Sequence, residues 1–257
     1  MKYIKKIGAV FLTTILEISI TSYYDRNDLY ARFYPEERGD WIIGHEKGTN
    51  GCSILGLTEE GKKKDVLVLP LEIDGLEVDC IGEKKWHLTS PEIVFDHCKK
   101  IYCNSLTPSV HTSISFGDQE IQGYFPLRYT SRIQTSLEDY TNANIFLSKK
   151  FFDYNKEKQE YEKEKYHLAN IEYQIDVDEC YFVDNVESGK IEIIPPTPYK
   201  KGYKFDGWYL NSMFTFDGVF IGGGMKWDFD NCLVEDYFND DNRIVLKAKW
   251  DEVEEEI

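Results

Sequence analysis

The sequence predicts a mainly β protein: a short, irregular β-solenoid of stacked repeats, one linking helix and a small C-terminal β domain. The first observation is composition, because 15% of the 257 residues are aromatic, mostly Tyr and Phe, which pack well in strands. The second is a series of short apolar segments between residues 41 and 147. The third is a pair of alternating segments, 203–209 and 244–250, that close the chain. The length of 257 residues allows one large domain or two domains of ordinary size.

The first half of the chain contains four short apolar segments bounded by turn-forming residues: 66–69, 93–95, 114–116 and 145–147. Their centres lie about twenty to thirty residues apart, the period at which leucine-rich repeats stack one strand per turn. A single short strand cannot bury its own apolar face, but stacked neighbours bury it for one another. Because the spacing is irregular, an ordinary β-sandwich remains open as an alternative.

The segment 151–168 predicts the linking helix. Its charged residues are good helix formers, and its apolar residues form a narrow stripe. We expect this helix to cover the open end of the repeat stack or to join the two halves of the protein.

Beyond residue 170 the pattern is that of a separate β domain. Residues 171–183 alternate like one or two strands, and the prolines of 195–198 favour an extended segment. Alternation in the next strand places Trp208 opposite the face of Tyr203 and Phe205, unless Gly207 bends the strand.

The N-terminus has the pattern of a secretion signal, because Lys2, Lys5 and Lys6 precede an apolar stretch at 7–16 that is too short to span a bilayer. An amphipathic or buried segment of a cytosolic protein is the alternative. The predicted organisation is a signal peptide at 1–22, a repeat region at 23–150, the linking helix at 151–168, the C-terminal domain at 169–251 and an acidic tail at 252–257.

The segment GCSILGLTEEGKKKDVLVLPLEIDGLEVDCIGEKKW, residues 51–86, resembles a BspA-like (type 5) leucine-rich repeat. The resemblance rests on an apolar strand ending in Pro70, the Asp74-Gly75 turn, a short strand at 76–80, and Ile81-Gly82 before an aromatic residue. Gly75 permits the positive φ that such a turn needs. The resemblance implies a leucine-rich repeat region over about residues 41–147, with degenerate later copies.

The C-terminal text PPTPYKKGYKFDGWYL, then WDFD and NRIVLKAKW, resembles the Listeria–Bacteroides (internalin-type B) repeat. That family implies a small β-grasp-like domain of secreted and wall-associated proteins. One departure is the stretch 214–224, a longer central loop than usual. The matching residues are Pro196, Pro198, Gly202, Tyr203, Phe205, Gly207, Trp208, Tyr209, Trp227, Phe229, Leu246, Ala248 and Trp250.

Both modules in one chain are typical of surface proteins of gut-dwelling Gram-positive bacteria. The combination implies a non-catalytic, extracellular or cell-surface protein that acts in binding or adhesion through its repeat face. The partner we expect is a protein or glycan at the cell surface. The alternative is a carbohydrate-active enzyme or its accessory glycan-binding module.

The net charge of −16 argues against nucleic acid or anionic lipid as a partner, and no transmembrane segment is expected. Four acids, Asp228, Asp230, Asp240 and Asp241, could attract calcium, but solvated loop acids are the favoured interpretation. We therefore predict no enzyme activity, no catalytic residue, no cofactor and no metal. The histidines follow no zinc motif: His45, His87, His97, His111 and His167.

The cysteines are scattered without a Cys-x-x-Cys pair, which favours buried core fillers over disulfides: Cys52, Cys80, Cys98, Cys103, Cys180 and Cys232. Several tyrosines in polar surroundings could serve as contact groups, or complete the core beneath loops. These are Tyr23, Tyr24, Tyr30, Tyr34, Tyr124 and Tyr129.

Overall fold

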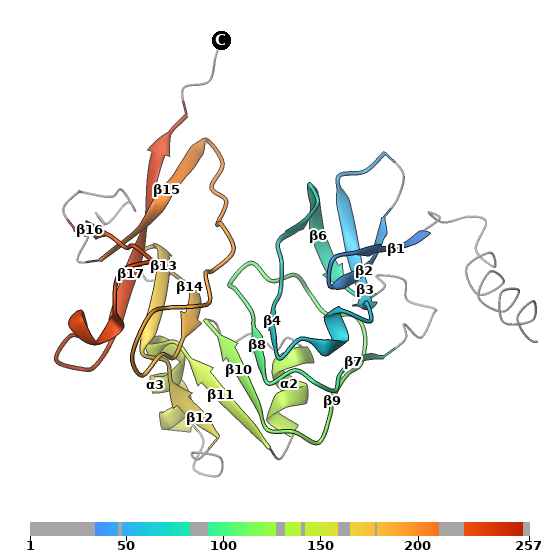
Figure 1. The fold of residues 1–257 in the computed structure, drawn as a ribbon, viewed down its shortest axis with the longest axis horizontal. Coiled ribbons are helices and arrows are strands. Elements are labelled where there is room, and N and C mark those ends of the chain that lie inside the picture. Colours follow the sequence, from blue (N-terminus) through green and yellow to red (C-terminus); the bar gives the residue numbers. More distant parts are fainter. Residues whose placement is uncertain are drawn as a thin grey trace, which may run out of the picture.

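The computed structural model describes residues 34–45, 48–82, 92–126, 132–139, 142–158, 165–177, 179–210 and 224–253. The predicted signal peptide at 1–22 and the loop residues 214–223 lie outside these ranges. Within them the chain forms three five-stranded sheets, a two-stranded sheet and two α-helices (Figure 1). The prediction of a mainly β protein is confirmed.

The N-terminal sheet has the order β1-β2-β3-β6-β5. The hairpin between β5 and β6 turns at Asp74 and Gly75, which both have positive φ values, 50° and 83°. A two-residue turn of this kind requires such backbone angles, so the predicted Asp74-Gly75 turn is confirmed. The strands are β1 (Tyr34–Arg38), β2 (Trp41–His45), β3 (Gly51–Leu57), β5 (Glu72–Ile73) and β6 (Leu76–Ile81), and the short 3-10 helix η1 (Gly61–Lys63) follows β3.

The second sheet is parallel throughout, in the order β12-β11-β10-β8-β4. Tyr102, Tyr124 and Phe146 occupy the same register on three adjacent strands, and each is 22 residues after the one before. The strands are β4 (Val66–Val68), β8 (Lys100–Tyr102), β10 (Ile121–Phe125), β11 (Ala143–Leu147) and β12 (Tyr166–Leu168).

The four apolar segments predicted as strands are all strands, forming β4, β7 (Ile93–Phe95), β9 (Ile114–Phe116) and β11. β7 and β9 pair in parallel as the two-stranded sheet. The sequence did not predict β8 and β10, which lie inside the second sheet.

The helix predicted at 151–168 is present over residues 151–158, but its predicted C-terminal end is wrong. The helix α3 spans Lys149–Lys158, and Tyr166–Leu168 is the edge strand β12. The reason is tertiary: these three residues pair in parallel with β11, and Tyr166 is buried, which outweighs the helical charge pattern. Residues 159–164 lie outside the described ranges. A second helix, α2 (Arg132–Asp139), was not predicted and packs beside β9, β10 and β11.

The C-terminal sheet has the order β14-β13-β17-β15-β16, with a parallel β13–β17 pair at its centre. The strands predicted within 171–183, 203–209 and 244–250 are confirmed, and β17 extends to Glu252, one residue into the expected tail. The strands are β13 (Ile171–Asp176), β14 (Glu179–Asp184), β15 (Tyr203–Leu210), β16 (Met225–Lys226) and β17 (Ile244–Glu252), with the 3-10 helix η2 (Val234–Asp236) before β17.

A bulge at Gly207 decides where Trp208 points. The register of β15 against β17 shifts between Phe205 and Gly207, and Gly207 has a φ of 151°. Because the extra residue reverses the alternation, Phe205 and Trp208 lie on the same face, with ring centroids 5.2 Å apart. Trp208 is 3% exposed, whereas Trp250 is only partly buried at the edge of the same core.

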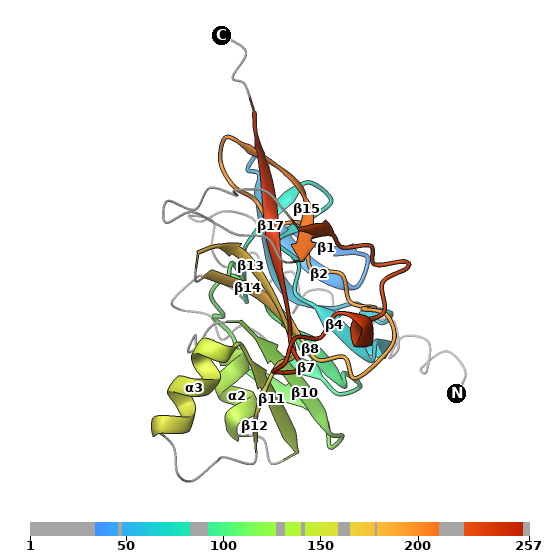
Figure 2. The same ribbon diagram turned by 90° about the vertical axis from the view of Figure 1, so that its left-hand side faces the viewer.

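The C-terminal sheet packs on the outward face of the parallel strands. Tyr102 stacks on Tyr124 and on Phe182 of β14, with centroids 4.2 Å and 5.3 Å apart. Figures 1 and 2 show β13 and β14 beside β10 and β11, and both tyrosines belong to the C-terminal core. The opposite face of the same strands, including Ile101 and Ile145, packs into the N-terminal core.

Candidate functional site

A buried ion pair stands at the junction between α3 and the C-terminal sheet. Arg243, just before β17, places Nη2 2.5 Å from Oε1 of Glu172 on β13, and the two residues are 7% and 5% exposed. The Glu172 carboxylate also accepts the backbone N–H of Lys149, at the N-terminal end of α3, where a negative charge is favourable. Arg243 Nε donates to the Ala169 carbonyl over 3.5 Å. These contacts hold the guanidinium in place.

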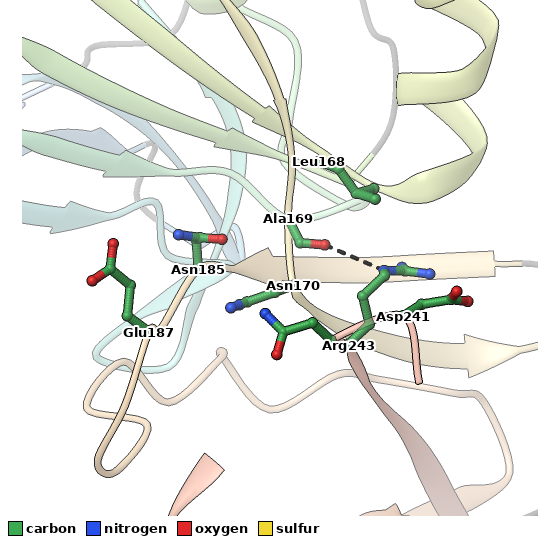
Figure 3. Close-up of a pocket in the computed structure, with 8 residues that line it drawn as sticks. Leu168, Ala169, Asn170, Asn185, Glu187, Asp241 and Arg243 are labelled. Atoms are coloured by element: carbon green, nitrogen blue, oxygen red, sulfur yellow. Dashed lines mark hydrogen bonds between the residues drawn. The ribbon is translucent and has the colours of Figure 1, made fainter. Parts of the chain in front are cut away.

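One side of Arg243 faces a polar hollow of about 340 Å³ (Figure 3). Its wall comes from three stretches of the chain: the β12–β13 junction, the end of β14 and the turn before β17. Beside Arg243, its lining residues include Leu168, Asn170, Asn185, Glu187, Asp241 and Asn242.

The hollow has a floor of fixed side chains, Asn170 and Arg243, and a rim of four side chains that no other described residue holds. Asn170 is locked by two bonds to Val186: its Nδ2 donates to the carbonyl over 2.8 Å, and its Oδ1 accepts the N–H over 3.0 Å. In the part of the chain that the structure describes, four other lining side chains make no hydrogen bond or ion pair: Asn185, Glu187, Asp241 and Asn242. Their donors and acceptors are therefore available to a ligand.

The other side of Arg243 borders a second hollow, of about 410 Å³, lined by Glu172, Gln174, Cys180 and the first residues of α3. Glu172 already supplies the negative charge at this helix end. Burial raises the pKa of the Cys180 thiol well above its usual range, so the thiol stays protonated and is a poor nucleophile. This second hollow therefore offers no activated group.

A strip of side chains also remains partly exposed on the outward face of the parallel sheet. We call Gln122, Asn144, Phe146 and His167 the outer strip. The Phe146 and His167 rings lie 5.1 Å apart, and His167 Nε2 is 2.9 Å from Asn144 Oδ1. Burial lowers the pKa of His167, and because an amide oxygen only accepts, the neutral ring carries its proton on Nε2.

The outer strip is held by further hydrogen bonds. Asn144 Nδ2 donates to Oε1 of Glu120 over 2.8 Å, and the Tyr124 hydroxyl donates to Oε1 of Gln122 over 2.9 Å. Adjacent strands therefore present polar and aromatic side chains in fixed orientations.

The residues singled out from the sequence do not form a metal site. No group of three or more His, Cys, Asp or Glu side chains suited to a metal occurs within the described ranges. Asp228 caps its own turn by accepting the N–H groups of Asp230 and Asn231, whereas Asp241 lines the polar hollow. His87 lies outside the described residues; His45 and His167 are on strands of different sheets.

All six cysteines are free and buried, which confirms the interpretation as core fillers. Burial raises the pKa of Cys52 to about 11 and that of Cys98 to about 12. Tyr124, considered a contact group, is 1% exposed and belongs to the core. Tyr34 begins β1, and the other four tyrosines named with it lie outside the described ranges.

The comparisons with known proteins add no relative. No protein-family model matches the chain, and no curated protein or solved structure matches it. The two family resemblances therefore rest on residue patterns alone. Of the helices that the structure describes, none has the length and apolar character needed to cross a bilayer.

Proposed function

We propose that this chain is a non-catalytic, exported bacterial surface protein that acts in binding or adhesion through its leucine-rich repeat face. In this proposal the parallel sheet is a short β-solenoid and the C-terminal sheet is a β-grasp-like domain. The 22-residue step from Tyr102 to Tyr124 and on to Phe146 supports the first assignment, because leucine-rich repeats have periods of 20–29 residues. The second is supported by the buried Trp208, Leu246 and Ala248 of the C-terminal motif.

The outer strip is the observation that carries the proposal. Its side chains stand on paired strands and are held by hydrogen bonds, so a partner would meet them with little loss of side-chain entropy. The neighbouring Tyr102 and Tyr124 are covered by β14, whereas the outer strip stays partly exposed and can meet a partner.

The rival function, a carbohydrate-active enzyme, predicts a carboxylate pair facing a cleft lined by tryptophan. The polar hollow has two carboxylates, Glu187 and Asp241, but no tryptophan lines it. This composition favours binding over turnover.

The test is capture of partners from host and cell-wall fractions by the purified mature protein. Asn144→Ala removes the side chain that bonds both His167 and Glu120, and it should reduce the captured material about tenfold, as expected for a contact residue worth about 1.4 kcal/mol. Asn142→Ala is the matched control, because Asn142 is exposed and precedes β11. Equal capture by the two variants would contradict the proposal, as would a hydrolytic activity of the wild-type chain toward a captured glycan.

A further inference from the structure

We infer that the polar hollow beside Arg243 binds a neutral, hydroxyl-rich ligand: one sugar residue of a glycan. This inference rests on the proposed binding function and assigns a second contact site, apart from the outer strip. The hollow's volume of about 340 Å³ falls in the lower part of the range of small-ligand sites.

The floor of the hollow is preorganised. Asn170 is fixed by Val186, and Arg243 is fixed by Ala169 and Glu172. Such groups keep their orientation when a ligand arrives, so only the rim side chains have to be ordered on binding. Leu168 adds an apolar patch of the kind on which the C–H face of a sugar ring can rest.

The charges around the hollow disfavour an anionic ligand. The positive charge of Arg243 is balanced by Glu172 at 2.5 Å. The remaining charged groups are the carboxylates of Glu187 and Asp241, so an anion would meet net repulsion.

The free rim groups distinguish a hydroxyl-rich ligand from a cationic one. Asn185 and Asn242 each offer an amide donor and an amide acceptor, whereas Glu187 and Asp241 only accept. A lysine side chain has only donors, so it can bond to the carboxylates and the amide oxygens but not to the amide N–H groups, which would keep their water. A hydroxyl both donates and accepts, and can therefore bond to any of these groups.

The probe is an array of immobilised neutral, sialylated and amine-bearing oligosaccharides, with a lysine-rich peptide beside them, presented to the full-length chain. Asp241→Ala removes one rim acceptor, and Asp240→Ala is its control because Asp240 is exposed and does not line the hollow. Asn242→Gly deletes an amide at a residue with a φ of 57°, a conformation that glycine adopts freely.

We expect retention of neutral glycans with little dependence on salt, weakened about tenfold by Asp241→Ala and by Asn242→Gly and unchanged by Asp240→Ala. Three results overturn the inference: no retention of any neutral glycan, equal binding by Asp241→Ala and Asp240→Ala, or retention only of amine-bearing probes that is lost at high salt. A chain that still captures a partner through Asn144 but retains no glycan refutes this inference alone, and leaves the proposed function standing.

Discussion

The hydroxyl of Tyr102 links the parallel sheet to the C-terminal sheet, and its removal gives a sharp test of how the two parts are joined. It donates to Oδ1 of Asp184 over 2.8 Å, and both residues are buried. Tyr102→Phe deletes this bond but keeps the ring that stacks on Tyr124 and Phe182. A hydrogen bond to a charged buried group is worth about 1.5–3 kcal/mol, so we expect a loss of that size in the free energy of unfolding at pH values where Asp184 is ionised in the folded protein.

The loss should depend on pH. Burial raises the pKa of Asp184 above its unfolded value of about 3.9, and the Tyr102 hydroxyl partly opposes this rise. A raised pKa in the folded state means that stability from this group is fully present below about pH 3.9 and is lost as pH rises through the folded value. Removing the Tyr102 hydroxyl raises the pKa of Asp184 in the folded protein further. The loss of unfolding free energy caused by Tyr102→Phe is therefore largest above that pKa and becomes smaller toward acid pH.

The assay is urea unfolding, followed by tryptophan fluorescence, at several values between about pH 4 and about pH 8. Tyr181→Phe is the matched control: it deletes the hydroxyl of another fully buried tyrosine, which donates to the Pro196 carbonyl over 3.0 Å. That neutral bond is worth about 0.5–1.5 kcal/mol at every pH. A Tyr102→Phe cost that equals the control, or that does not change with pH, would refute the reasoning.

Two further predictions concern the C-terminal sheet. Arg243→Met leaves Glu172 buried without its cation and should cost about 3–5 kcal/mol in urea unfolding. Lys249→Met, at the more exposed pair with Asp206, is the control and should cost much less; similar costs would mean that the buried pair does not stabilise the junction. Trp208→Ala should cost about 3–5 kcal/mol of stability, and Trp250→Ala should cost less because Trp250 is only partly buried. If thermal melts show the larger loss for Trp250→Ala, the bulge at Gly207 does not turn Trp208 into the core.

The sequence was informative where a strand carries its own apolar pattern. The segments 66–69, 93–95, 114–116 and 145–147 are short but strongly apolar, and each contains a strand. Strands β8 and β10 were missed because their outward positions mix Lys100 and Gln122 with tyrosines, which resemble surface residues until β14 covers them. The sequence pattern predicts helix at β12 for a related reason: nothing in the local spacing of apolar residues indicates that β12 pairs with β11.

The candidate site could not be predicted from the sequence. Arg243 and Glu172 are far apart in the chain and meet because β13 and β17 pair in parallel, with Ile171 opposite Ile244. Among the rim residues only Asp241 was singled out, as a calcium candidate; in the hollow it lies with Glu187 and two asparagines, and within the described residues these acids belong to no group of three that could hold a metal. A strand pairing of this kind has no local signal: Glu172 stands at a polar position of the β13 alternation, which by itself indicates a solvent-facing residue, and its burial follows only from the tertiary fold.

The contact between the two sheets bears on how the protein could bind a partner. If the C-terminal sheet were only a spacer, the outward side chains of the parallel strands would be polar and exposed along their whole length. Instead Tyr102 is buried between Tyr124 and Phe182, and its hydroxyl donates to Asp184. Separating the parts would expose these rings and break a bond to a buried carboxylate, so the two sheets should unfold together. The outer strip and the polar hollow are then fixed relative to one another by the fold, and a partner that engages both needs no rearrangement of the protein.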